Sequence, residues 1–350
     1  MKLKRILAFA VALICAAPAA TGFIDYDNVC IIAEAEQVDS ESNFKFRIDS
    51  DTEQNKFAVV TGYDGSESTI TVPSVVIDEN GDEYTVKFIE CGCFKNNTTL
   101  EKVTIPNTVI GFNTDTYYTS EAFYGCTSLK EVVFEENSKL EIIGMSLFSG
   151  CTSLETIAIP DSVNTIYESA FKDCSALKEI NLNNIKTIQA YAFDGCKSFE
   201  SITLYEGLET IGDFAFLNCP SMKSVTVPES VTEIGKLAFG ATSRFSWTTG
   251  TGVAYDPIDG FVVNGYENSE AQAYVERTGK LTFNAISGSV SGDIDGDGQI
   301  TSADALGVLQ MVVSSEALTD EQKKIADLDG DGNVTSADAL YILQMVVGLR

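Results

Sequence analysis

Hydrophobic and polar positions repeat with a fixed long period between residues 90 and 240. Each unit has a Phe, a Cys three residues later and then a Leu-x-x-Ile-x-Ile pattern or a close variant, and the units begin at Phe123, Phe148, Phe171, Phe193 and Phe216. Successive Phe residues are 25, 23, 22 and 23 positions apart. Period-2 alternation predicts a short, half-buried strand in every unit. One unit cannot bury its apolar face alone, so we expect the units to stack into a solenoid with a continuous core.

Related segments occur between the units and upstream of them. "TIYESAF" and "TIGDFAF" are typical of the stretches between units, and degenerate units occur upstream as "CGCFKNNTTLEKVTIP" and "STITVP". The pattern resembles the BspA-like family of bacterial leucine-rich repeats over about residues 55 to 285. The resemblance implies an opening coil from Phe57, a closing segment from Phe261 and a repeat domain at 40–288. Two insertions interrupt the period, from Ile110 and from Ala241.

The cysteines of the units form a regular series: Cys126, Cys151, Cys174, Cys196 and Cys219. Such a series is compatible with disulfides or with a soft-metal site. Buried thiols that pack as small hydrophobic side chains are the alternative that we favour, because the repeat pattern alone accounts for the spacing. We therefore predict that these cysteines are mostly reduced.

The outward strand positions of the units show no aromatic platform. They are Thr104, Val133, Ala158, Asn181, Thr203 and Thr226. Aromatic side chains lie instead in the insertions, with Tyr117 and Tyr118 in the first and Trp247 in the second. They are candidates for ligand contacts, although packing over a flank of the solenoid is the commoner role of such residues. The sequence leaves both the role of these aromatics and the ligand of the repeats open.

A duplicated phrase near the C-terminus has a different character. Residues 292–314 and 326–348 are identical at 16 of 23 positions. Each copy places oxygen-bearing residues at loop positions 1, 3, 5, 7, 9 and 12 and Gly at position 6, a spacing that supplies the six to eight oxygens that Ca²⁺ prefers. The predicted ligands are Asp293, Asp295, Asp297, Gln299, Thr301 and Asp304, followed by Asp327, Asp329, Asp331, Asn333, Thr335 and Asp338. We expect two calcium ions.

The flanking sequence distinguishes these loops from an ordinary EF-hand. Position 12 is Asp, and the Gly- and Ser-rich "NAISGSVSG" before the first loop excludes an entering helix. A helix is predicted after each loop, and a linking helix after the capping box of Thr319 and Gln322. Two loop-helix repeats resemble the type I dockerin, a module that binds cohesin domains of a scaffoldin. The resemblance covers about 289–350 and implies cohesin contacts at Ser302, Ala303, Leu309, Gln310, Ser336, Ala337, Leu343 and Gln344.

The first predicted helix carries two adjacent apolar stripes. One runs through Ala305, Val308 and Val312, and the other through Leu306, Leu309 and Val313. We expect one stripe to pack the core of the module and the other to face a partner. Their sequences do not distinguish the two roles.

Composition and the N-terminus limit the remaining classes of protein. The first 20 residues have the layout of a secretory signal peptide, with cleavage uncertain up to residue 35, and Ile14 before Cys15 disfavours a lipoprotein. No other apolar run approaches the length of a membrane span. A net charge of −28 disfavours nucleic acid as a partner. The absence of His removes the Ser-His and Cys-His catalytic pairs.

These features predict a mixed fold: a β-rich leucine-rich-repeat solenoid followed by a small all-α, calcium-binding dockerin. The expected protein is a non-catalytic, secreted component of a cellulosome-like, polysaccharide-degrading complex. It is attached through cohesin, and its repeat domain binds or adheres to an unknown protein or polysaccharide. The alternatives are a carbohydrate-binding module and, less favoured, a glycoside hydrolase, because the stacked units offer no cleft for two opposed carboxylates. Which cohesin binds is not predicted.

Overall fold

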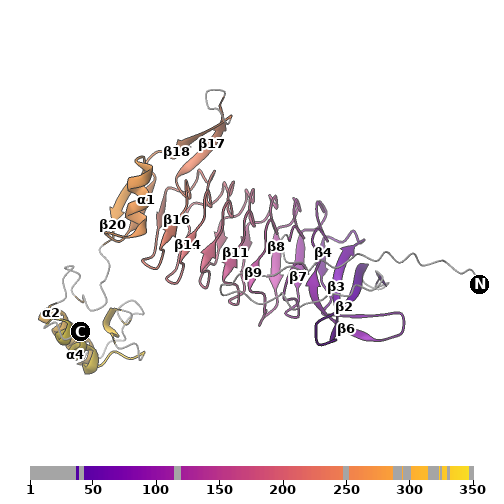
Figure 1. The fold of residues 1–350 in the computed structure, drawn as a ribbon, viewed down its shortest axis with the longest axis horizontal. Helices are drawn as coiled ribbons and strands as arrows, with labels where there is room; N and C mark the ends of the chain where they lie inside the picture. The colour runs from indigo at the N-terminus through magenta and orange to yellow at the C-terminus, as the bar shows by residue number, and fades with distance from the viewer. Residues whose placement is uncertain are drawn as a thin grey trace, which may run out of the picture.

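The computed structural model describes residues 37–38, 43–113, 120–246, 252–286, 294, 301–313, 323, 325–328 and 332–346. The prediction of a β-rich solenoid is confirmed, with coils side by side along one axis between β2 and β20 (Figure 1). In the described part of the chain the helices are α1 (Glu270–Thr278), α2 (Ser302–Val313) and α4 (Ser336–Val346). The signal peptide predicted in the first 20 residues lies outside the described residues, as does most of the linking helix predicted after Thr319.

The N-terminal end of the solenoid is covered by a mixed five-stranded sheet of order β1-β2-β3-β6-β5. Its strands are β1 (Gln37–Val38), β2 (Phe44–Ser50), β3 (Lys56–Tyr63), β5 (Val75–Ile77) and β6 (Glu83–Ile89). Phe44 and Phe46 alternate with half-buried residues along β2 and belong to the main core. The ring of Phe44 lies 6.3 Å from that of Phe94, the first ring of the repeat units. The sheet thereby shields the first coil from water.

Each regular coil contributes short parallel strands to two rows. The first row contains β4 (Thr69–Thr71), β7 (Lys102–Ile105), β8 (Glu131–Phe134), β10 (Thr156–Ile157), β12 (Glu179–Ile180), β15 (Ser224–Thr226), β19 (Val262–Gly265) and β20 (Thr282–Ala285). The second row contains β9 (Ile142–Ile143), β11 (Thr165–Ile166), β13 (Thr187–Ile188), β14 (Thr210–Ile211) and β16 (Glu233–Ile234). Pairs such as Ile166 and Ile188 hold equivalent positions of neighbouring coils in register. The second row was not predicted, because two residues are too few to show a period.

The repeat Phe residues form a stacked column through the core. Neighbouring rings from Phe94 to Phe239 have centroids 4.9 to 5.5 Å apart. All are buried, and burying one such side chain contributes about 1.5–3 kcal/mol. The backbone before each repeat Cys is left-handed, with φ of 57–80° from Gly125 to Asn218. Gly, Asp and Asn tolerate this conformation best, which explains why these residue types precede the Cys.

The helix α1 closes the C-terminal end of the solenoid with side chains. In the preceding coil, the carbonyl of Ile211 accepts from the N–H of Gly235, which lies in the last coil. The strand β16 is the last of the second row, so no further coil pairs with it. Arg277 instead donates to the carbonyl of Ile234 at 3.0 Å, and Glu270 accepts from the N–H of Ile234 at 3.2 Å. Backbone groups at this edge are therefore satisfied by α1.

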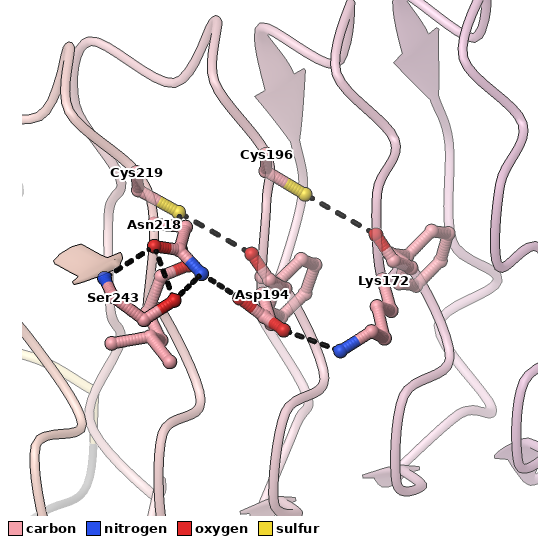
Figure 2. A network of polar contacts seen from close by, with 9 residues as sticks. Lys172, Asp194, Cys196, Asn218, Cys219 and Ser243 are labelled. Atoms are coloured by element: carbon pink, nitrogen blue, oxygen red, sulfur yellow. Dashed lines mark hydrogen bonds and ion pairs between the residues drawn. The ribbon is translucent and has the colours of Figure 1, made fainter. Parts of the chain in front are cut away.

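The hairpin of β17 (Ala241–Phe245) and β18 (Val253–Pro257) projects from the last coil (Figure 1). A polar chain fastens its base to three earlier coils (Figure 2). Asn218 donates to the buried carboxylate of Asp194 at 2.8 Å and accepts from the Ser243 N–H at 2.7 Å. Lys172 completes the chain, with its Nζ 2.5 Å from Asp194 Oδ2.

Candidate functional site

The last predicted ligand of each calcium loop is a fully buried carboxylate at the first turn of its helix. Asp304 Oδ1 accepts from the N–H of Ile294 and Oδ2 accepts from the N–H of Thr301, both at 2.7 Å. Asp338 repeats the arrangement with Leu328 and Thr335, both at 2.8 Å. Each carboxylate thus holds the two arms of its loop together. The equality of the copies follows from their nearly identical sequences.

The donors in the described part of the loops fit a hard cation. Gly332 has φ 86° and donates to Asp327 Oδ2 at 2.8 Å, so the loop turns back over its first carboxylate. Carboxylate and Thr hydroxyl oxygens are the ligands that Ca²⁺ prefers. Several predicted ligands lie outside the described residues: Asp293, Asp295, Asp297, Gln299, Asp329 and Asp331. Among the described residues no group of three or more His, Cys, Asp or Glu is gathered for a metal, and the complete ligand sets stay predictions.

The structure distinguishes the two apolar stripes of α2. Ala305 and Val308 are buried in a small core with Ala326, Ala339 and Ile342. The other stripe faces outward, with Leu306 56% and Val313 82% exposed. Val312 departs from the expected inner stripe, since it is 40% exposed and Met311 packs against the core instead. A step of about 100° per residue places Val312 between Ala305 and Val308 on the helix, so its exposure follows from how the module packs against α2 and not from the helical period.

The outward faces of α2 and α4 are matched in exposure. Leu309 and Leu343 are both 40% exposed, and Leu306 and Leu340 are 56% and 55% exposed. The residues predicted to contact cohesin are exposed or half-buried on both helices: Ser302, Ala303, Leu309, Gln310, Ser336, Ala337, Leu343 and Gln344. The module therefore presents two similar surfaces with apolar centres.

The outward row of the repeats carries mostly small and polar side chains, and ion pairs connect its coils. Lys102 pairs with Glu131 at 2.7 Å, and Lys178 pairs with Glu155 at 2.7 Å. No strand joins β12 to the next coil, where Thr203 forms only an isolated bridge to Thr226. The break lies in the unit that has Phe199 where the preceding units have Leu.

This break opens a polar groove of about 600 Å³. Its lining includes Glu179, Glu200, Ser201 and the 40% exposed Tyr205. The groove was not predicted from the sequence, because an interrupted pairing between coils leaves no periodic signal. The only hint in the sequence is Phe199.

The five repeat cysteines are buried, as predicted, and the structure has them as free thiols, while their mostly reduced state stays a prediction. Each thiol donates to the carbonyl of the repeat Phe of the preceding coil, for example Cys126 to Phe94 at 3.0 Å and Cys219 to Phe193 at 3.3 Å. Figure 2 shows this contact for Cys196 and Cys219. Burial raises the pKa of Cys126 and of Cys219 to about 12. Such thiols are poor nucleophiles and act as packing groups.

The candidate aromatics of the insertions are placed only in part. Tyr117, Tyr118 and Trp247 lie outside the described residues. In the second insertion Tyr255 stacks on Phe214 with ring centroids 5.5 Å apart, and Phe214 stacks on Tyr191 at 4.9 Å. Packing against the flank of the solenoid is therefore at least one role of this insertion.

Stacked Phe-Cys-Leu coils and a duplicated loop-helix module define the class of protein. The profile of the BspA type Leucine rich repeat region matches residues 79–121 and 116–246 with six copies, and that of the Dockerin type I domain matches 291–346. The chain thus carries BspA-type leucine-rich repeats and a C-terminal type I dockerin. No curated protein matches it.

Solved structures of bacterial leucine-rich repeat proteins are similar to this chain. The T. pallidum Leucine Rich Repeat protein is 24% identical, with 54% of this chain and 83% of that chain covered and a TM-score of 0.45. A leucine-rich repeat protein from Bacteroides ovatus is 17% identical, with 77% and 69% covered and a TM-score of 0.42. A leucine rich cell surface protein from Faecalibacterium prausnitzii is 23% identical, with 59% and 74% covered and a TM-score of 0.37.

The two domain types indicate in general terms what the chain binds and where such proteins are found. A type I dockerin is a calcium-binding module and implies attachment to a cohesin, while leucine-rich repeats imply binding. Proteins with these domains are typically extracellular, and neither domain type is typically catalytic. Within the described residues, no helix has the length and apolarity that a membrane span requires.

Proposed function

We propose that this chain is a secreted, non-catalytic component of a cellulosome-like complex that degrades polysaccharides. Residues 289–350 bind two calcium ions and attach the chain to a scaffoldin cohesin, and residues 40–288 bind a second ligand. The observation that supports attachment most strongly is the pair of matched, exposed apolar faces on α2 and α4. An isolated module has no internal use for so much exposed apolar surface.

The contacts that would hold calcium come from both ends of each loop. Buried Asp304 and Asp338 already join the start of the loop to the start of the helix. Bound calcium supplies positive charge to the crowded carboxylates of residues 290–350, which hold 11 Asp and Glu against 3 Lys and Arg. By joining each loop to its helix, Asp304 and Asp338 orient the helix faces that meet cohesin.

For the repeat domain we favour a protein or substrate ligand on the polar outward face. Carbohydrate binding is the second candidate, since the groove beside Tyr205 combines an exposed ring with carboxylates and hydroxyls. Sugars are held by such hydrogen-bonding groups together with an aromatic side chain. A glycoside hydrolase remains the least favoured alternative.

The test uses the full chain in two arms. In the first, a cognate cohesin is titrated with calcium and with excess chelator, and calcium-dependent binding is expected. In the second, a chain with both cohesin faces blocked is mixed with insoluble cellulose, xylan or pectin and, separately, with secreted proteins of the source organism. Depletion by a polysaccharide that Tyr205→Ala removes and Tyr124→Ala preserves supports the groove as a carbohydrate site. Specific capture of one protein with no depletion supports a protein ligand.

A further inference from the structure

A pocket of about 510 Å³ lies at the C-terminal end of the solenoid. The last coil, the hairpin β17–β18 and the helix α1 all contribute to its lining. Ile234, Phe239 and Tyr274 give it a largely apolar interior and are themselves buried. This size and character are typical of small-molecule sites. The polar chain through Asn218 and Ser243 fixes the base of the hairpin, so this wall of the pocket is anchored.

The rim of the pocket is positively charged in a chain that is strongly acidic. Lys236, Lys280 and Arg277 line it, although the whole chain has only 23 Lys and Arg against 51 Asp and Glu. Arg277 pairs with Glu270, and the one carboxylate in the lining, Asp256, pairs with Arg244. Among the described residues Lys236 and Lys280 form no ion pair, and both are exposed. The Nζ of Lys236 lies 5.9 Å from the centroid of the Phe214 ring, so this ammonium group contacts an aromatic ring and pairs with no carboxylate of the described residues. The charges of both lysines can therefore act on an anionic group at the mouth.

The coils beside the pocket carry large side chains at a backbone position that disfavours them. The residue two before the repeat Phe is left-handed, with φ of 56–58° at Ser146, Ser169, Tyr191 and Phe214 and 50° at Leu237. Earlier units place Gly92, Glu121, Ser146 and Ser169 there, and the last three place Tyr, Phe and Leu. Bulky residues are uncommon in this conformation, and such outliers concentrate at ligand sites. Leu237 lines the pocket, and the stacked rings of Tyr191, Phe214 and Tyr255 lead to it.

We propose that this pocket binds a small organic anion with a flat aromatic body. The apolar interior takes the rings, and Lys236 and Lys280 hold the negative group at the mouth. A neutral compound of the same shape lacks the attraction to Lys236 and Lys280 and binds more weakly, and a cationic compound is repelled by them. The site involves neither the cohesin faces nor the polar groove, so its test is independent of the proposed function.

The experiment titrates the full chain with 2-naphthoate and with uncharged 2-naphthamide by calorimetry. Lys236→Gln with Lys280→Gln removes both charges, and Lys139→Gln with Lys197→Gln removes two exposed charges outside the pocket lining. Thr278→Phe, on the pocket side of α1, fills part of the volume. Thermal unfolding of every variant verifies that the fold is kept.

We expect saturable naphthoate binding that weakens roughly tenfold or more in the double pocket variant. The matched control should bind as the parent chain does, and Thr278→Phe should weaken both compounds. Absence of saturable binding, equal affinity for the amide, or an equal loss in the control each overturns the proposal. If a variant unfolds early, naphthoate protection of the parent chain against thermal unfolding, compared with the amide, decides in its place.

Discussion

The hydroxyl of Tyr274 lies 2.9 Å from both the backbone N and the carbonyl O of Phe239, accepting from the first and donating to the second. In earlier coils the Phe N–H donates to the next coil, as Phe216 does to Ala238 at 2.8 Å. At the last coil the hydroxyl of Tyr274 takes the place of the next coil as the acceptor for the Phe239 N–H. It also donates to the carbonyl of Phe239. Burial raises the pKa of Tyr274 to about 12, so the hydroxyl stays protonated at neutral pH. A side chain of α1 thereby satisfies the N–H and the carbonyl of Phe239 at the end of the β-solenoid.

Tyr274→Phe should destabilise the repeat region. The change keeps the ring but leaves a buried N–H and carbonyl of Phe239 without this hydroxyl, at a cost of about 1–3 kcal/mol. Urea unfolding followed by tyrosine fluorescence measures the difference. Tyr205→Phe, which removes an exposed hydroxyl in the same region, is the control and should leave the midpoint unchanged. Equal midpoints for Tyr274→Phe and the parent chain would contradict the capping role.

Stability of the repeat region should fall in alkali because of its buried thiols. The pKa of Cys126 and of Cys219 is about 12 in the folded chain against an ordinary value of 9.0. Between these values the unfolded chain binds fewer protons, so the free energy of unfolding falls as pH rises, by about 1.4 kcal/mol per pH unit for each thiol. Denaturant titrations at several pH values measure this slope. Cys126→Ala should reduce the slope, whereas Cys91→Ala, at an exposed position, should leave it unchanged.

Calcium removal should unfold the dockerin and spare the repeats. Excess chelator leaves the loop carboxylates to repel one another, so the helical circular dichroism of α2 and α4 is lost while the β signal of the solenoid persists. Asp304→Asn should weaken the calcium response, and Asp259→Asn in the repeat region serves as the charge-matched control. Helical signal that is equal with chelator and with calcium would contradict this prediction.

The long-period features of the fold were predictable from the sequence. The Phe, Cys and Leu positions recur in every unit, so stacking follows from the need to bury them, and the buried Cys196 between Phe193 and Phe199 illustrates this. The duplicated Asp spacing likewise drew attention to Asp304 and Asp338, which the structure buries, while their role as calcium ligands stays a prediction. These features depend on patterns that are repeated several times along the chain.

Features that depend on one coil or on distant segments could not be predicted. The groove beside Thr203 arises where the segments of two neighbouring coils fail to pair as strands. The sequence of a single unit does not determine how far it lies from the next coil. The pocket brings Lys236 and Lys280 together from a coil and from the end of α1. The exposure of Val312 depends on how two helices pack. Each of these outcomes is set by tertiary contacts.

Two cohesin-binding orientations are the remaining prediction, and the matched helix faces support it. Ser302 and Ala303 recur as Ser336 and Ala337, and Leu309 has the same 40% exposure as Leu343. Turning the module by half a revolution therefore offers nearly the same surface to the partner.

Replacing Ala303 and Leu309 by Arg and Glu should block one face and leave the other available. The expected cost is the factor of two in orientations, about 0.4 kcal/mol, measured by calorimetry with a cognate cohesin. The matching variant on α4 should also keep binding, and the combined variant should lose it. The differences of Gly307 from Tyr341 and of Ser314 from Gly348 bias the orientations, so the two single-face variants need not be equal. Loss of binding in either single-face variant alone would show that only one face is used, because the intact face would then have failed to compensate.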